Sequence, residues 1–195
     1  MNLKFASALS AGIILLVFLF SNFSIKKTNS DLFKNETEKY SENDFYQPGR
    51  KMKIESSIFI NNGTIPVEYT CNGASRPIPL KVSGVPGNAK SLALIVDDPD
   101  APSGDFVHWV IWNIDPKIKI IESKKLMGAV EGFTSLKKPG WVAPCPPSGI
   151  HHYHFKLYAL DTILHIPQSS TKKELISAMN GKIIDSTILT GLYGR

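Results

Sequence analysis

Cysteine is scarce in this chain of 195 residues, and its scarcity narrows the possible functions. The two cysteines, Cys71 and Cys145, do not form a C-x-x-C pair, which argues against a zinc site or a thioredoxin-type redox centre. The sequence also has no internal repeat, no heptad pattern and no run of basic residues. These absences disfavour a coiled coil and a nucleic-acid-binding protein. The formal net charge of +5 is mild and suits attraction to anionic ligands or surfaces.

Charge is also missing from the N-terminal segment. Phe5 to Phe20 contains no charged residue, and Lys26 and Lys27 follow soon after. This length lies between a signal-peptide core and a short membrane span, so residues 1–25 are predicted to be a signal peptide or an N-terminal membrane anchor. The protein is therefore expected to be exported, either membrane-anchored or periplasmic or secreted after cleavage. Residues 26–51 are polar and aperiodic and predict a flexible linker, which leaves 52–195 as the globular domain.

The globular part is rich in short β-like segments that Pro and Gly separate, which predicts a mainly β domain. Thr171 and Glu174 form a capping-box pattern ahead of Leu175, Ile176 and Met179, so a helix is expected there, with Gly181 at its end. The expected strands are 52–60, 65–70, 91–97, 106–114 and 152–160, with a last strand within 186–195.

Two of these strands carry apolar residues on both faces. Residues 91–97 contain almost no polar position before Asp97, which Asp98 follows. Residues 106–114 are apolar apart from His108 and Asn113. Strands of this kind are covered on both sides, so both should be central in their sheet.

Polar residues interrupt the buried strands in a regular pattern. Because side chains two positions apart share a face, Asp98 continues the row of Leu92, Leu94 and Val96. By the same count His108 shares a face with Phe106 and Val110, and His151 and Tyr153 share one with Phe155. His152, His154 and Lys156 fall on the opposite face. If Asp98, His108 and His151 converge, they form a small-ligand pocket with an apolar wall. A metal site made of these three residues is conceivable, but their spacing is not diagnostic.

Several ordered motifs resemble the phosphatidylethanolamine-binding protein family, which includes the Raf kinase inhibitor-like proteins, and are most similar to its bacterial and archaeal branch. The motifs are Asp97–Pro102 (DDPDAP), Val107–Trp109 (VHW) and Pro144–Phe155 (PCPPSGIHHYHF), supported by Tyr69–Gly73 and Tyr158–Asp161. The resemblance spans residues 52–195.

The resemblance implies a Greek-key β-sandwich with one or two peripheral helices and a shallow anion pocket. It assigns Asp98, His108, His151 and Tyr153 to this pocket and places Pro146 and Pro147 in the loop at its border. Two departures affect the rim. The loop before His108 is short and lacks a tyrosine, and Trp141–Ala143 stands where relatives have Tyr and glycines.

The resulting hypothesis is non-enzymatic binding of small phosphate-bearing or other anionic ligands, such as phospholipid headgroups. Histidine N–H groups donate to an anion, while an ionised Asp98 only accepts and is better suited to orient a histidine. The alternative is a protein-interaction module that inhibits a kinase or protease. Catalysis is not expected, since no nucleophile motif accompanies the Asp and His residues, and Ser148 and Cys145 are the only nearby nucleophiles. No cofactor, metal or nucleic acid is implied.

The two cysteines allow either a single disulfide or two free thiols. Cys71 lies beside a predicted turn and Cys145 lies in the loop that borders the pocket. We expect them to approach each other, and export would allow them to form a disulfide.

Overall fold

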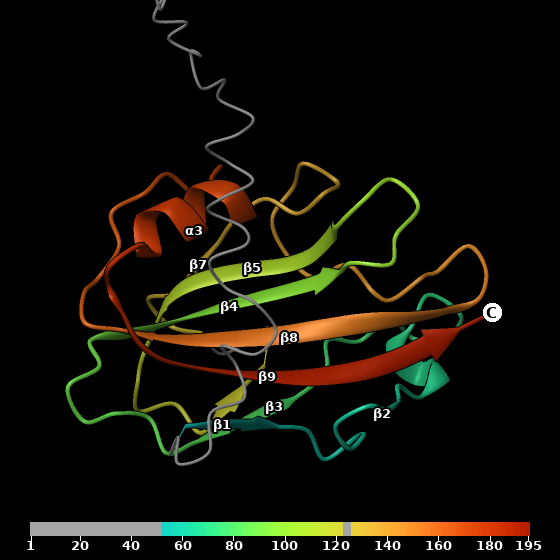
Figure 1. The fold of residues 1–195 in the computed structure, drawn as a ribbon, viewed down its shortest axis with the longest axis horizontal. Coiled ribbons are helices and arrows are strands. Elements are labelled where there is room, and N and C mark those ends of the chain that lie inside the picture. The colour runs from blue at the N-terminus through green and yellow to red at the C-terminus, as the bar shows by residue number, and fades with distance from the viewer. Residues whose placement is uncertain (1–51, 123–125) are drawn as a thin grey trace, which may run out of the picture. The chain divides into compact units, whose positions relative to one another are not determined.

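The computed structural model describes residues 52–122 and 126–195, which form two β-sheets with a helix on one side (Figure 1). The predicted N-terminal segment and linker, residues 1–25 and 26–51, lie outside the described residues. The strands are β1 (Lys53–Glu55), β2 (Gly63–Thr64), β3 (Leu80–Ser83), β4 (Ser91–Asp98), β5 (Phe106–Ile114), β6 (Ile120–Ile121), β7 (Val130–Glu131), β8 (Ile150–Leu160) and β9 (Ile183–Gly194), and the helices are the 3-10 helix η1 (Val67–Tyr69) and α3 (Lys172–Met179).

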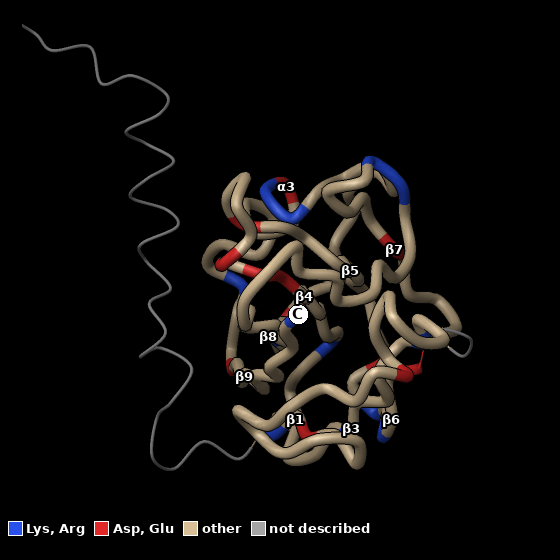
Figure 2. The backbone as a smooth tube through the Cα atoms, turned by 90° about the vertical axis from the view of Figure 1, so that its right-hand side faces the viewer, with Lys and Arg blue, Asp and Glu red and all other residues tan. Residues whose placement is uncertain are grey.

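The larger sheet has six strands in the order β2-β9-β8-β4-β5-β7, and the smaller has three in the order β1-β3-β6. All pairings are antiparallel except that of β2 with β9. Figure 2 shows the smaller sheet on one side of the larger and α3 on the other. The predicted mainly β sandwich is therefore confirmed, and β4 and β5 occupy inner positions of the larger sheet, as their apolar faces predict.

The main core lies between the two sheets. Leu94 and Val96 of β4 and Phe155 of β8 are fully buried there and belong to the same cluster as Ile54 and Leu80 of the smaller sheet. Alternate residues of the same strands point to the opposite face, because side chains alternate along a strand.

Helix α3 covers that opposite face. Its buried residues Leu175 and Met179 pack in a second cluster with Ile95 of β4 and Trp112 of β5. The predicted capping box is present: Glu174 accepts a hydrogen bond from the Thr171 backbone N–H at 2.9 Å. The helix begins at Lys172 because this reciprocal contact satisfies N–H groups that have no partner within a helix.

Two strand predictions were wrong, that for 65–70 entirely and that for 52–60 in part. Residues 65–70 do not form a strand. The Ile65 N–H donates to the Leu192 carbonyl at 2.7 Å, but Pro66 has no N–H, and the chain then turns through η1. The predicted strand 52–60 is limited to β1, since Ser56 leaves the ladder and bonds to the Pro79 carbonyl at 3.1 Å.

No helix within residues 52–122 and 126–195 combines the length and the apolar character that crossing a membrane requires.

Candidate ligand-binding site

Asp98 and His151 meet where β4 ends and β8 begins. The His151 Nδ1–H donates to Asp98 Oδ2 at 2.7 Å, and both side chains are buried. The second Asp98 oxygen, Oδ1, accepts from the Asp100 backbone N–H at 2.9 Å. Both carboxylate oxygens therefore have protein donors, and Asp98 fixes the orientation of the His151 ring and of the turn that follows β4.

The His108 side chain lies near Asp98 and His151 because the pairing of β4 with β5 is irregular. Val96 pairs with Trp109 but Asp97 pairs with Val107, so His108 is an extra residue in β5. Such a β-bulge shifts the alternation of side chains by one position. The predicted shared face of Phe106 and His108 is correct, since their rings lie 4.8 Å apart and both line one side of the sheet. The predicted face shared with Val110 was wrong: Val110 packs under α3, whereas the His108 ring lies 5.2 Å from that of Tyr153.

The His108 ring is held by the segment that passes over it. Its Nδ1–H donates to the Val142 carbonyl at 2.8 Å, and the Val142 N–H donates to the His108 carbonyl at 2.9 Å. Burial lowers the pKa of His108, and this outweighs the opposite effects of the Val142 carbonyl and the Asp98 carboxylate. The ring is therefore neutral at pH 7 with its proton on Nδ1. Its Nε2 is a buried acceptor without a hydrogen-bond partner in the described part of the chain.

A surface cavity of about 160 Å³ brings the predicted residues together. Asp98, His108, His151, Pro146 and Pro147 all line it. Sequence reasoning had placed Cys145 in the bordering loop and Val142 and Ala143 at the rim, and these residues also line the cavity. It missed the other lining residues, which belong to the turn after β4 and the start of β5: Ala101, Pro102, Ser103 and Phe106. Most of these are apolar or small and carry no signal of function in a sequence.

Tyr153 is not among the lining residues. It lies behind His108, with the two rings in a T-shaped arrangement, and is fully buried. Its hydroxyl makes no hydrogen bond of good geometry within the described residues, although the Cys145 main chain lies near enough to interact with it. Burial, assisted by the Asp98 carboxylate, raises the pKa of Tyr153 well above its ordinary range. Tyr153 therefore acts as a neutral wall that supports His108.

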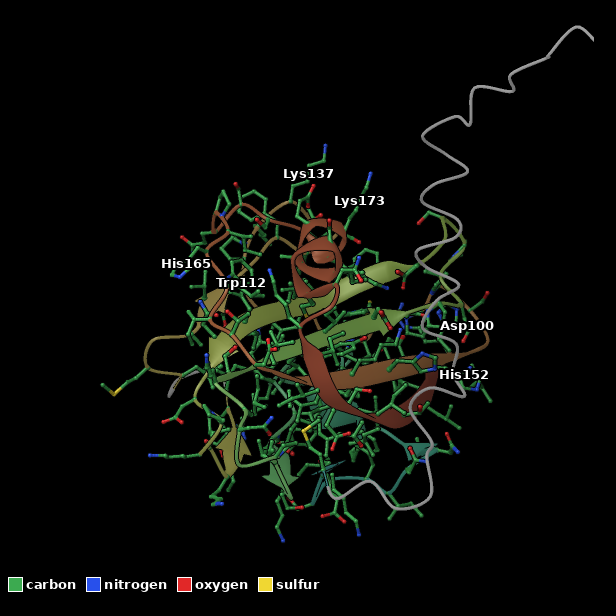
Figure 3. The ribbon with its side chains drawn as sticks, turned by 60° about the vertical axis from the view of Figure 1, so that its left-hand side comes forward. Asp100, Trp112, Lys137, His152, His165 and Lys173 are labelled. Atoms are coloured by element: carbon green, nitrogen blue, oxygen red, sulfur yellow. A yellow bond between two sulfur atoms is a disulfide. The ribbon has the colours of Figure 1, made fainter. Side chains whose placement is uncertain are left out.

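The opposite face of β8 carries the other polar residues, as predicted. Figure 3 shows Asp100 and His152 close together, and His152 Nδ1 lies 2.7 Å from Asp100 Oδ2. Farther along, Lys156 and Lys172 bond to Asp97, which is buried beneath α3. Asp97 and Asp98 are consecutive but face opposite sides of the sheet, so only Asp98 belongs to the cavity.

A disulfide joins Cys71 to Cys145, with their Cα atoms 5.4 Å apart, so the expected approach of the two cysteines is confirmed. The bond ties the turn after η1 to the loop that borders the cavity. The Cys71 N–H also donates to the Pro144 carbonyl at 3.0 Å.

A larger hollow of about 360 Å³ lies beside β1 and β3, lined by Glu55, Ser56, Ser57, Pro79, Lys81 and Ile120. It contains no histidine and no buried polar atom without a partner. The smaller cavity is the better candidate because polar groups converge in it. Across residues 52–122 and 126–195, no three His, Cys, Asp or Glu side chains are grouped so that they could hold a metal ion.

Comparison with known proteins gives a consistent result. The family model described as phosphatidylethanolamine-binding protein matches residues 55–194. A UPF0098 protein of Pyrococcus horikoshii is 46% identical over 155 residues, which cover 74% of this chain and 78% of that protein. A UPF0098 protein of Chlamydia trachomatis is 38% identical over 149 residues, covering 74% and 99%.

Two solved structures resemble this fold. The crystal structure of a phosphatidylethanolamine-binding protein homologue from Chlamydia trachomatis matches with a TM-score of 0.72 and 37% identity, covering 75% of this chain and 99% of that one. Escherichia coli YbcL, described as a member of the mammalian family, matches with a TM-score of 0.69 and 27% identity, covering 74% and 99%.

Proposed function

The chain belongs to the phosphatidylethanolamine-binding protein family, and from that premise we propose that its cavity binds a small phosphate-bearing or other anionic ligand without transforming it. One observation carries this proposal. Each of the two cavity histidines uses Nδ1–H on a protein oxygen, and within the described residues neither Nε2 has a protein partner. Two ring nitrogens in one cavity are therefore left to meet a ligand.

The two nitrogens favour a ligand that both donates and accepts. Neutral His108 presents an Nε2 lone pair, which requires a donor. The Asp98 carboxylate orients the His151 ring, and its Nε2 can donate to an oxygen of the ligand when it carries a proton. A phosphomonoester monoanion suits both, because it carries one P–OH donor and several acceptor oxygens.

The size of the cavity limits how much of the ligand enters. Sites that enclose drug-sized molecules have volumes of about 300–1,000 Å³. The cavity here, at about 160 Å³, accommodates a phosphoryl group with a few attached atoms. The rest of a larger ligand would extend over the rim formed by Pro146 and Pro147.

Binding without catalysis is supported by the state of the nearby nucleophiles. Cys145 is held in the disulfide, and no hydrogen bond within the described residues joins Ser148, or Ser103 of the cavity lining, to either cavity histidine. An acyl- or phosphoryl-transfer mechanism needs a nucleophile within hydrogen-bond reach of its base.

Titration calorimetry with glycerol phosphate and with sulfate, at pH 6 and pH 8, tests the proposal. The phosphomonoester should bind more tightly at pH 6, where a larger fraction is the monoanion, because its second pKa is about 6. Sulfate lacks the donor, and an unpaired buried acceptor costs about 1–3 kcal/mol, so sulfate should bind about tenfold more weakly at pH 6.

His108→Ala should weaken phosphomonoester binding by about 1.5–3 kcal/mol, the contribution of a hydrogen bond to a charged group. His165→Ala is the matched control, since His165 is exposed and lies outside the cavity. Equal affinities at both pH values, together with an unaffected His108→Ala variant, would rule out this mechanism. That result would favour the alternative role, a protein-interaction module that inhibits a kinase or protease.

We also propose, from the uncharged run Phe5 to Phe20, that the protein is exported or anchored at a membrane. Fractionation of cells that produce the full chain tests this, and recovery of the protein only from the cytosol would refute it.

A further inference from the structure

The disulfide lies at the rim of the cavity and is open to solvent. Cys145 is one of the lining residues and is exposed, while Cys71 is partly buried. A thiol in solution can therefore approach the Cys145 sulfur. Access is the first requirement for thiol–disulfide exchange, in which a thiolate attacks one sulfur and the other leaves.

A fixed positive charge lies beside both sulfurs. Arg195 Nη2 is 2.7 Å from Cys71 Sγ and 3.1 Å from Cys145 Sγ, and Arg195 Nε donates to Asn72 Oδ1 at 3.0 Å. The same Asn72 oxygen accepts from the Tyr193 hydroxyl at 2.9 Å, so the guanidinium is held in place by a network. A neighbouring cation lowers the pKa of a thiol and stabilises its thiolate. Because a leaving thiol of lower pKa leaves faster, this arrangement favours exchange.

The disulfide also restrains the segment that forms one wall of the cavity. Residues 142–147 supply Val142, Ala143 and the proline pair to that wall, and the Val142 carbonyl orients His108. Two residues beyond this segment, Gly149 and Arg195 exchange two backbone hydrogen bonds, of 3.0 and 3.1 Å. Opening the disulfide would remove the covalent restraint that lies between the Val142–His108 contact and the Gly149–Arg195 bonds.

We propose that the Cys71–Cys145 disulfide is a thiol-exchange site, opened by a dithiol, that controls ligand binding in the adjacent cavity. The ligand-binding part of this inference rests on the proposed function. Exchange begins when one thiolate of the dithiol attacks Cys145 Sγ. A mixed disulfide forms, the original S–S bond breaks, and Cys71 leaves as a thiolate beside Arg195. The second thiolate of the dithiol then attacks the other sulfur of the dithiol, which is bonded to Cys145 Sγ in the mixed disulfide, and Cys145 leaves as a thiolate. The dithiol is oxidised to a disulfide, and the protein gains two electrons.

The rate of opening tests the role of Arg195 independently of any ligand. The full-length oxidised protein is mixed with dithiothreitol, and free thiols are trapped with a maleimide and counted by mass spectrometry over time. Arg195→Gln should be reduced about fivefold more slowly than wild type, whereas Arg195→Lys, which keeps the charge, should react at nearly the wild-type rate. Equal rates in all three proteins would refute a role for the guanidinium in exchange.

The effect on the cavity is measured with inorganic phosphate by titration calorimetry, on oxidised, reduced and reoxidised protein. Reduction should weaken binding about fivefold or more, and reoxidation should restore it. The Cys71→Ser/Cys145→Ser variant should behave like the reduced protein. Unchanged affinity after reduction would overturn control of the cavity.

Two further outcomes are decisive. If reduction unfolds the protein, as seen by circular dichroism, the bond is a structural restraint and not a switch. If the oxidised protein binds no phosphate, the proposed function fails. The His108 ring signals in an NMR spectrum then show whether reduction alters the cavity, and signals that do not change would refute the inference separately.

Discussion

Asp97 offers the sharpest test of how this fold is held together. Its side chain is fully buried at the end of β4, and its Oδ2 accepts hydrogen bonds from Lys156 Nζ at 2.9 Å and Lys172 Nζ at 2.5 Å. Lys156 belongs to β8 and Lys172 is the first residue of α3, so one carboxylate joins three elements. Lys172 also bonds to Asp105, which precedes β5.

The charges in this cluster depend on one another. Burial by itself acts to raise the pKa of Asp97, but the two lysines, Lys172 and then Lys156, bring it below its ordinary value. Burial acts to lower the pKa of Lys172, but Asp97 and Asp105 raise it above its ordinary value. The Asp97 carboxylate is therefore ionised and Lys172 is charged at neutral pH.

Replacing Asp97 by Asn removes a negative charge that both lysines share and keeps the volume of the side chain. Removing one partner of a buried pair costs about 3–5 kcal/mol, because the remaining charge is left without compensation. The lysine side chains are 19% and 18% exposed and can reach some water, so we expect about 3 kcal/mol. For a domain of this size, that loss lowers Tm by about 10 °C.

Urea unfolding at pH 7 measures the loss, with Asp105→Asn as the control. Asp105 bonds to the same Lys172 but is 42% exposed, so its removal should cost less than about 1 kcal/mol. A lowered carboxylate pKa stabilises the fold above the unfolded value of 3.8, and this stability is lost as the pH falls through the folded value. The stability of Asp97→Asn should therefore depend less on pH below pH 4. A variant within 1 kcal/mol of wild type would refute the reasoning.

Three further predictions concern the cavity, the core and the domain boundary. Since burial lowers the pKa of His108 below 6.5, the unfolded chain takes up a proton first as the pH drops, and the free energy of unfolding should fall below about pH 6.5. His108→Gln should lessen this fall, and parallel stability curves for the two proteins would contradict the prediction. A methyl group added at Gly191 would lie 2.7 Å from an Ile65 side-chain atom and 2.9 Å from Phe59, so Gly191→Ala should lower the free energy of unfolding in urea by about 1–3 kcal/mol. Gly87→Ala, which has open space around it, should lower it by less than about 1 kcal/mol, and equal losses would contradict the packing argument. Because the family match covers residues 55–194, a protein comprising residues 52–195 should unfold cooperatively on heating, and a broad, non-cooperative transition would show that residues 1–51 contribute to the core.

The longest elements could be predicted from the sequence because their signals are local. The predicted strand 106–114 coincides with β5, the prediction for 91–97 falls one residue short of β4, and 152–160 lies within β8. Their apolar runs are long enough to show periodicity, and the capping pattern of Thr171 and Glu174 marked the start of α3. Strands of two to four residues, such as β2, β3, β6 and β7, are too short to show a period and were missed.

The candidate site likewise contains residues whose position could be predicted from the sequence and one whose position depended on strand pairing. Asp98 and Tyr153 could be assigned to the inner face by counting, because β4 and β8 pair without a shift from Ser91 to Asp97. The prediction for His108 reached the right place although one of its premises was wrong: the bulge at His108 breaks the alternation that would have placed this residue on the face of Val110. A bulge depends on which residues of two strands pair, and that pairing is not encoded within either strand alone.

By itself, the sequence determined the mainly β class, the central strands and the polar residues that lie in line with the buried faces of β4 and β8, since each follows from local composition and spacing. The tertiary structure decided which residues meet. It joined Cys71 to Cys145 across a sequence separation of 74 and placed Arg195 beside both sulfurs. Among residues 52–122 and 126–195, it left the His108 Nε2 without a hydrogen-bond partner. These contacts form between segments far apart in the chain, where the packing of two sheets, and not the pattern within any one segment, fixes the distance between side chains.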